Sequence, residues 1–150
     1  MEKVSRSAAV PYSAKCLYDL VNDVESYPQF LPWCGGAKIL EKSSSEIVAS
    51  VEISKGAMRK TFTTQNTLHP HDRIEMKLVS GPFKTLHGIW QFEALDENTC
   101  RVSLDLEFDF SNRVIAMVVG PVFHHIANTL LDAFVERAHQ VCETPDGDND

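Results

Sequence analysis

The segment from Arg101 to Phe110 alternates polar and apolar residues without an exception. Successive side chains of a strand point to opposite faces, so this segment predicts a sheet with one solvated and one apolar face. Residues 112–142 then repeat apolar side chains at helical spacing, which predicts one long helix. A one-sided apolar sheet followed by a helix long enough to cross it predicts a sheet that grips the helix, with a hydrophobic hollow between them. The apolar strand positions are Val102, Leu104, Leu106, Phe108 and Phe110, and the helix stripe comprises Ile115, Val118, Val119, Val122, Ile126, Leu130, Phe134 and Val141.

Length and composition set broad limits on the class of protein. The chain has 150 residues, 43% of them hydrophobic and 23% charged, which is ordinary for one globular domain. Its net charge of −7 argues against broad electrostatic binding to naked nucleic acid, although a local basic patch or a protein partner stays open. The cysteines are scattered and form no CxxC pair, so reduced thiols are expected. Because we find no signal peptide or membrane span, we expect a cytoplasmic protein.

The N-terminal part predicts one strand and two short helices. The strand, at Val4–Val10, ends at Pro11, which has no backbone N–H to donate to a sheet. Ser13 is a suitable N-cap for a short amphipathic helix. A second helical turn is expected at Val24–Tyr27.

The remaining strands follow with hairpin spacing. Short polar turns between successive strands imply an antiparallel meander, and a sheet of this width must curve to cover its apolar face. Residues 1–143 therefore predict an α+β, helix-grip fold in which a curved antiparallel sheet of about seven strands wraps around the C-terminal helix. The strands are expected at Ala37–Lys42, Glu46–Ser54, Met58–Leu68, Arg73–Val79, Thr85–Ala94 and Arg101–Phe110.

Two features modify the C-terminal part. Gly120-Pro121 lies inside the long helix, where proline loses a hydrogen bond and clashes with the preceding turn, so a kink or a break is expected. Residues 144–150 are acidic and lack apolar side chains, which predicts a disordered tail.

An aromatic loop connects the second helical turn to the meander. The run Tyr27–Gly36 contains prolines and glycines that exclude a regular element, yet it also carries Tyr27, Phe30 and Trp33. Aromatic side chains in a stiff loop indicate packing over apolar surface. The loop is either a plug at the end of the core or the lid of a binding cavity.

Candidate metal ligands do not gather in the sequence. Adjacent side chains such as His124 and His125 diverge on a helix and do not readily share one ion. His69 and His71 flank a proline in a turn, with no third ligand implied by spacing. We therefore expect no metal.

Catalytic groups are equally sparse. Asp105, Glu107 and Asp109 occupy the polar parity of their strand, so a solvated face is favoured over an acid–base pair. No nucleophile elbow, catalytic-cysteine motif or phosphate-binding loop is present. The polar residues Thr64 and Asn66 share the apolar parity, where they are either satisfied core residues or contacts for a ligand's polar group.

The run Ser26-Tyr27-Pro28-Gln29-Phe30-Leu31-Pro32, with the strand–helix–meander–helix order, resembles the START-like, helix-grip superfamily, also labelled polyketide cyclase/dehydrase-like. Within it the chain is most similar to the coenzyme Q-binding protein family, particularly a bacterial branch of ribosome association toxins. The similarity extends through Val10-Pro11-Tyr12-Ser13, Lys60-Thr61-Phe62-Thr63-Thr64 and Gly81-Pro82-Phe83-Lys84. It implies a hydrophobic tunnel between sheet and helix.

The resemblance implies two functions. Mitochondrial members are implied to bind ubiquinone and support respiration, whereas the bacterial branch is implied to bind the large ribosomal subunit and block subunit joining. We expect a non-enzymatic protein that binds ubiquinone or a related polyprenyl lipid, with no catalytic cofactor and with a peripheral membrane encounter for ligand exchange. Ribosome association is the alternative, and a cyclase or dehydrase activity ranks last because no acid–base group lies on the inner parity.

Specific residues follow from these expectations. Lys55, Arg59 and Lys60 form a basic cluster near a hairpin tip and are the candidate ribosome contact, although such a cluster is also typical of a solvated turn. The expected walls and lid of the ligand cavity are Tyr27, Phe30, Leu31, Trp33, Val51, Ile53, Phe62, Thr64, Asn66, Met76, Leu78, Trp90, Leu104, Leu106, Val119, Phe123 and Ile126.

Overall fold

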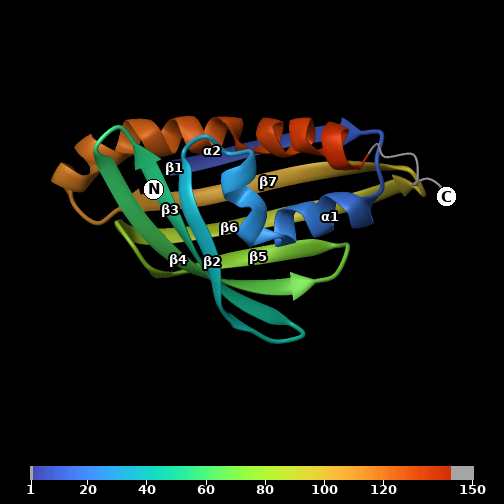
Figure 1. The fold of residues 1–150 in the computed structure, drawn as a ribbon, viewed down its shortest axis with the longest axis horizontal. Coiled ribbons are helices and arrows are strands. Elements are labelled where there is room, and N and C mark those ends of the chain that lie inside the picture. Colours follow the sequence, from blue (N-terminus) through green and yellow to red (C-terminus); the bar gives the residue numbers. More distant parts are fainter. Residues whose placement is uncertain (1, 143–150) are drawn as a thin grey trace.

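The structure, a computed structural model, describes residues 2–142 and forms one curved antiparallel sheet against a long helix (Figure 1). The seven strands lie in the order β1-β7-β6-β5-β4-β3-β2, so each strand from β2 to β7 pairs with its neighbours in the chain and β1 closes onto β7. The predicted α+β helix-grip fold is confirmed. The strands are β1 (Glu2–Val10), β2 (Cys34–Lys42), β3 (Glu46–Lys55), β4 (Met58–His69), β5 (Arg73–Ser80), β6 (Phe83–Asp96) and β7 (Thr99–Phe110), and the helices are α1 (Ala14–Asn22), the 3-10 helix η1 (Val24–Gln29) and α2 (Arg113–Val141).

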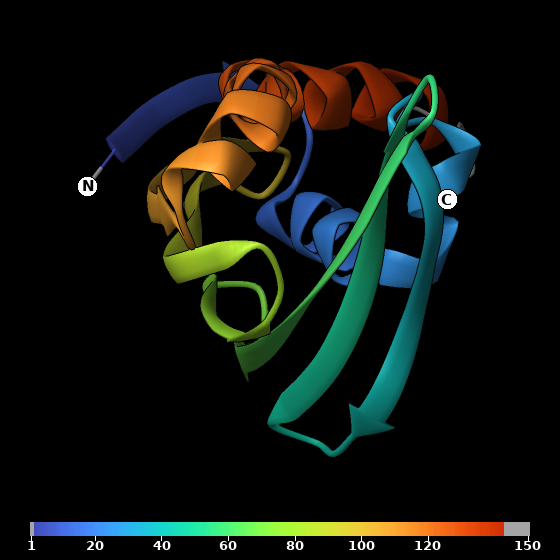
Figure 2. The same cartoon turned by 90° about the vertical axis from the view of Figure 1, so that its left-hand side faces the viewer.

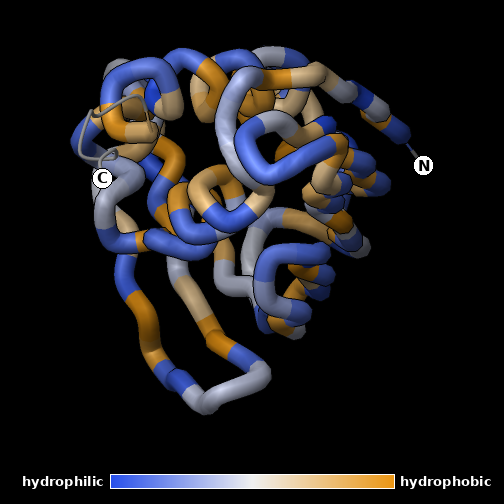
Figure 3. The backbone as a smooth tube through the Cα atoms, turned by 90° about the vertical axis from the view of Figure 1, so that its right-hand side faces the viewer, coloured by the Kyte–Doolittle hydropathy of each residue, from blue (hydrophilic) through white to orange (hydrophobic). Residues whose placement is uncertain are grey.

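Strand β7 has the two-faced character that its sequence predicts. Every apolar position from Val102 to Phe110 is buried, while the intervening positions are exposed or half-buried. On the outer face the Ser5 hydroxyl donates to the Asp105 carboxylate, and Lys3 lies 3.8 Å from Glu107. The acidic side chains of β7, Asp105, Glu107 and Asp109, therefore lie on the outer face of the sheet. Figure 3 shows both apolar and polar residues along the projecting β2–β3 hairpin, without the strict alternation of β7.

Strand β2 begins earlier than predicted, inside the aromatic loop. Cys34 pairs with Ile53, and the register then shifts before Gly36. The Ser54 N–H also donates to the Trp33 carbonyl at 2.8 Å. The Gly35-Gly36 pair thus accommodates a β-bulge rather than a free loop, because a bulge inserts an extra residue without ending the strand.

Both α-helices begin at a side-chain cap. The Ser13 hydroxyl accepts the Cys16 N–H at 3.1 Å, as predicted, and Asn112 Oδ1 accepts the Ile115 N–H at 2.9 Å. These contacts satisfy donors that lack intrahelical partners. They fix where α1 leaves β1 and where α2 leaves β7.

Of the kink or break predicted at Gly120-Pro121, the break is absent, because helix α2 continues through both residues. Figure 2 shows its first turns running in a different direction from the rest. Pro121 is exposed, which keeps its ring away from the core, and Gly120 is buried beside the ring of Phe110. By length and composition alone α2 is apolar enough to cross a membrane, but here its buried stripe packs on the sheet.

A disulfide joins the first turn of α1 to the end of α2. Cys16 of α1 is bonded to Cys142, the C-cap of α2, across a sequence separation of 126 residues. The expectation of reduced thiols is therefore wrong for this pair, because tertiary structure brings together residues that no local spacing connects. Cys34 and Cys100 are free and buried. The predicted acidic tail, residues 144–150, lies outside the described residues.

Candidate ligand-binding cavity

An apolar cavity of about 90 Å³ lies between α2 and the concave face of the sheet. Its walls come from strands β3 to β7, from α2, and from the segment around η1. The only ionisable side chain on the wall is the phenol of Tyr27, whose pKa is raised by burial. The lining residues are Val24, Tyr27, Trp33, Ala49, Val51, Phe62, Thr64, Asn66, Met76, Leu86, Gly88, Trp90, Leu106, Phe123, Ile126, Leu130 and Phe134.

A glycine in the middle of the sheet contributes to the cavity wall. Gly88 pairs with Met76 on one side and with Leu106 on the other. A Cβ at this position would lie 2.6 Å from Cδ2 of Leu106 and 2.7 Å from Cε of Met76. A Cβ at position 88 would displace the ends of these two side chains, so the glycine gives Leu106 and Met76 the room that they occupy in the cavity wall.

A polar pair interrupts the apolar wall. Thr64 and Asn66 are each only 7% exposed, and the Thr64 hydroxyl donates to Asn66 Oδ1 at 2.9 Å. Among the described residues this is the only hydrogen bond found for the Asn66 side chain, which leaves its amide N–H groups at the cavity. A buried amide gains from a hydrogen-bond acceptor, so the cavity suits an apolar molecule that carries an oxygen.

Aromatic rings close the cavity where η1 meets α2. Phe134 of α2 packs edge-on against Tyr27 at 5.4 Å, Phe30 at 5.3 Å and Trp90 at 5.2 Å between ring centroids. The Tyr27 hydroxyl donates to the Val21 carbonyl, which ties this closure to α1. Edge-to-face packing is the favourable arrangement for such rings. Tyr27 and Phe30 are thus held in place by α2.

A cation secures the same closure from outside. The Arg137 guanidinium lies 5.0 Å from the Phe30 ring centroid and donates to Gln29 Oε1 at 3.0 Å. Arg137 also donates to Gln140 Oε1 at 3.2 Å. The C-terminal half of α2 is therefore joined to the η1 segment by a cation–π contact and a hydrogen bond.

A wider surface recess of about 580 Å³ adjoins the cavity. The two spaces share Trp33 and Ile126 as lining residues, and this shared wall is called the Trp33–Ile126 partition below. Trp33 is half-buried, whereas Ile126 is 3% exposed. The recess is lined by Pro32, Trp33, Ser54, Lys55, Gly56, Pro121, Val122, His125 and Ile126.

The structure places the predicted site residues in three groups. The larger group lines the cavity, as given above. Leu31, Ile53, Leu104 and Val119 are buried in the core without lining it, and Leu78 lies outside it as well. Phe30 belongs to the aromatic closure rather than to the wall.

Sequence reasoning missed several wall residues that the patterns contained. Leu86 and Gly88 share the strand parity of Trp90, and Ala49 shares that of Val51. Leu130 and Phe134 continue the helical stripe from Ile126 at intervals of one turn. Only Val24, in the short η1 helix, had no periodic signal. The small residues Ala49 and Gly88 were overlooked because the prediction favoured large apolar side chains, whereas small residues also line a cavity.

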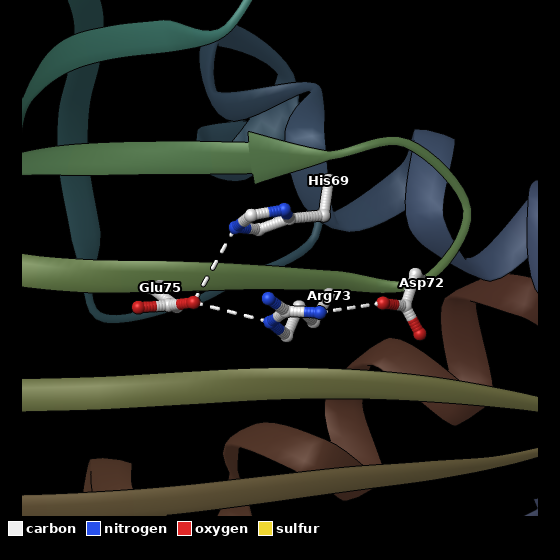
Figure 4. Close-up of polar contacts among 4 residues, drawn as sticks. All are labelled: His69, Asp72, Arg73 and Glu75. Carbon is white, nitrogen blue, oxygen red and sulfur yellow. Dashed lines mark hydrogen bonds and ion pairs between the residues drawn. The ribbon is translucent and has the colours of Figure 1, made fainter.

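A polar cluster on β4 and β5 lies away from the cavity (Figure 4). Glu75 lies 3.3 Å from His69 Nε2 and accepts a hydrogen bond from Arg73 Nε at 3.1 Å, while Arg73 Nη1 donates to Asp72 at 2.7 Å. The Arg73 guanidinium lowers the pKa of Glu75. These contacts secure the β4–β5 turn, where His71 adopts a φ of 66°. Within residues 2–142 no group of side chains is arranged to hold a metal ion.

Comparison with known proteins places this geometry in a family. Residues 10–135 match the family described as polyketide cyclase/dehydrase and lipid transport. The chain belongs to this family. The ribosome association toxin RatA of Pseudomonas aeruginosa is 49% identical, over 92% of this chain and 96% of that protein.

More distant similarities extend the comparison. The mitochondrial coenzyme Q-binding protein COQ10 homolog B of Xenopus laevis is 22% identical, over 91% of this chain and 58% of that protein. The crystal structure of the Zhui aromatase/cyclase from Streptomyces superposes with a TM-score of 0.81, at 17% identity, over 93% of this chain and 94% of that chain. At that identity the superposition shows a shared fold alone.

Proposed function

We propose that this chain acts on ribosome association by binding the large ribosomal subunit and blocking subunit joining. The supporting observation is the 49% identity to a ribosome association toxin across nearly the whole length of both proteins. This was the alternative in the sequence analysis, and the comparison favours it over quinone binding as the main function. The proposed location is the bacterial cytoplasm, where ribosomes are found.

The basic cluster at the β3–β4 hairpin is the proposed ribosome contact. Lys55 and Arg59 are exposed and Lys60 is half-buried, and the register brings all three to the hairpin tip. Arg59 also lies 3.4 Å from Glu52, so Lys55 is the less neutralised cation. Lysine and arginine at an exposed tip suit the phosphates of ribosomal RNA.

Sucrose-gradient profiles test this function. Adding the protein to separated subunits should reduce the joined-ribosome peak, and the double variant Lys55→Glu/Arg59→Glu should lose most of that effect. Lys42→Glu is the matched control, because Lys42 is exposed at the opposite end of the β2–β3 hairpin. Unchanged profiles with the wild-type protein would exclude the function, and equal loss with Lys42→Glu would exclude the hairpin contact.

We also propose that the cavity binds ubiquinone or a related polyprenyl compound without catalysis. The apolar wall with its Asn66 amide supports this second function, since a quinone combines a carbonyl oxygen with an apolar body. A wall with no ionisable group except the Tyr27 phenol offers little for acid–base chemistry. A volume of about 90 Å³ holds a small group rather than a polyprenyl tail, so binding requires the Trp33–Ile126 partition to open.

A short-chain ubiquinone analogue tests the cavity by quenching of tryptophan fluorescence, since Trp33 and Trp90 both line it. Gly88→Ala should weaken binding several-fold, because its methyl group enters occupied space. Gly36→Ala is the matched control, since nothing lies within 4 Å of a Cβ there. Absence of quenching in the wild-type protein, or equal affinity in Gly88→Ala, would contradict the proposed ligand site.

A further inference from the structure

The first turns of α2 present apolar side chains to solvent. Val114 is 68% exposed, Met117 73% and Val118 52%, although the helix becomes a core element from Val119 onward. Figure 1 shows this part of α2 projecting past the end of the sheet. Neighbouring apolar side chains at such exposure mark an interaction surface rather than a folding requirement.

The turns at the same end of the molecule carry only basic charged residues, although the protein as a whole is acidic. The β3–β4 turn, the β5–β6 turn and the start of α2 meet there, and the Ser111 N–H donates to the Pro82 carbonyl at 3.2 Å. Residues 55–60, 79–84 and 110–118 contain no Asp or Glu, although the chain carries a net charge of −7. The charged residues of these segments are Lys55, Arg59, Lys60, Lys84 and Arg113.

The exposed apolar turns lead to the cavity. Val118 lies one helical turn before Pro121 and Val122, which line the surface recess. The recess in turn ends at Trp33 and Ile126, the partition of the inner cavity. The recess therefore lies between the tip of α2 and the proposed ligand site.

We propose that this end of the protein docks on an anionic phospholipid bilayer. Val114, Met117 and Val118 enter the boundary between headgroups and acyl chains, and the surrounding lysines and arginines contact the headgroups. Because Lys55 and Arg59 are also the proposed ribosome contact, the bilayer and the ribosome compete for this end of the protein. A basic amphipathic surface of this kind is typical of peripheral membrane binding. Exposed apolar side chains gain from burial in lipid, whereas the phosphate backbone of RNA offers them no comparable environment.

Docking gives the recess a role in ligand exchange. With the tip of α2 in the bilayer, the recess faces the lipid, and an apolar molecule passes the Trp33–Ile126 partition without crossing water. This exchange step rests on the proposed ligand binding in the cavity. The docking itself rests only on the exposed apolar turns and the basic rim.

Vesicle flotation of the full chain tests the docking. Wild-type protein should float with vesicles of phosphatidylglycerol and phosphatidylethanolamine but not with phosphatidylcholine alone. Met117→Ser/Val118→Ser should weaken flotation by about tenfold, since both lost side chains contribute buried apolar area. Leu40→Ser/Leu95→Ser is the matched control, because these leucines are 50% and 48% exposed at the opposite end of the sheet. Thermal unfolding of each variant checks that it is folded.

Several results would overturn the docking. These are no flotation with anionic vesicles, equal flotation of Met117→Ser/Val118→Ser, or equal loss in the leucine control. If the serine variant instead loses ribosome binding while vesicles fail to compete, the surface is a ribosome contact and the proposal is wrong. Protein that floats but never extracts ubiquinone from the vesicles would overturn the exchange step and the proposed cavity function, while its flotation supports docking.

Discussion

Opening the disulfide between Cys16 and Cys142 should lower the free energy of unfolding by several kcal/mol. The bond closes a loop with a sequence separation of 126 residues. In the chain-entropy relation a loop of that length corresponds to about 5 kcal/mol at 25 °C, and native bridges typically deliver about 2–4 kcal/mol. For a chain of this size that is a fall of roughly 5–15 °C in Tm.

Thermal and urea unfolding measure this effect directly. The oxidised protein, the protein reduced with dithiothreitol and the variant Cys142→Ser are compared under one set of conditions. Reduction and substitution should give the same lower midpoint, and dithiothreitol should have no further effect on Cys142→Ser. Alkylation after unfolding establishes the starting state, because only Cys34 and Cys100 are free in the oxidised protein.

Two results would refute the reasoning. One is alkylation of all the cysteines in protein purified without a reductant, which would mean that the bond does not form in solution. The other is an unchanged unfolding midpoint after verified reduction. The latter would mean that packing of α2 on the sheet already fixes the positions of Cys16 and Cys142 and that the closed loop adds nothing.

Three further predictions concern the packing of Phe134, the N-cap of α1 and the two buried thiols. Phe134→Ala should cost about 3–5 kcal/mol in urea unfolding, because the ring is 1% exposed and packs against several aromatic neighbours; a cost below 1 kcal/mol would contradict its place in the closure. Ser13→Ala should cost about 1 kcal/mol by the same measurement, and Ser44→Ala, in an exposed turn, serves as the control. Burial raises the pKa of the Cys34 and Cys100 thiols, so the unfolded chain loses these protons first and stability should fall as pH rises above their ordinary pKa. Urea midpoints from pH 7 to pH 10 check the sign, and a rising profile would contradict it.

Much of the fold was accessible from local patterns. The strict alternation in Arg101–Phe110 predicted the buried and solvated faces of β7, and Ser13 predicted the start of α1. These predictions succeeded because they depend on the backbone geometry of neighbouring residues. Of the kink or break expected at Gly120-Pro121, the break is absent because the turns of α2 that follow are held by packing on the sheet, and the first turns of the helix run in a different direction from the rest (Figure 2).

The candidate site was only partly accessible. Asn66 was recognised as a polar residue on an apolar face, but its pairing with Thr64 and its position at a cavity depend on the curvature of the sheet. Gly88 was placed on the inner face without any indication that Leu106 and Met76 fill the space beside it in the cavity wall. The position of a cavity cannot be derived from the order of residues, since it depends on how side chains of opposing elements meet.

The sequence by itself determined the strands, their two faces, the helix caps and the resemblance to a helix-grip family. The tertiary structure alone decided the Cys16–Cys142 bond, the bulge at Gly35-Gly36, the cavity and the exposed apolar tip of α2. The division has one physical reason. Side-chain direction along a strand or helix is set within a few residues, whereas which of these surfaces meet, and which remain uncovered, is set by contacts between segments far apart in the chain.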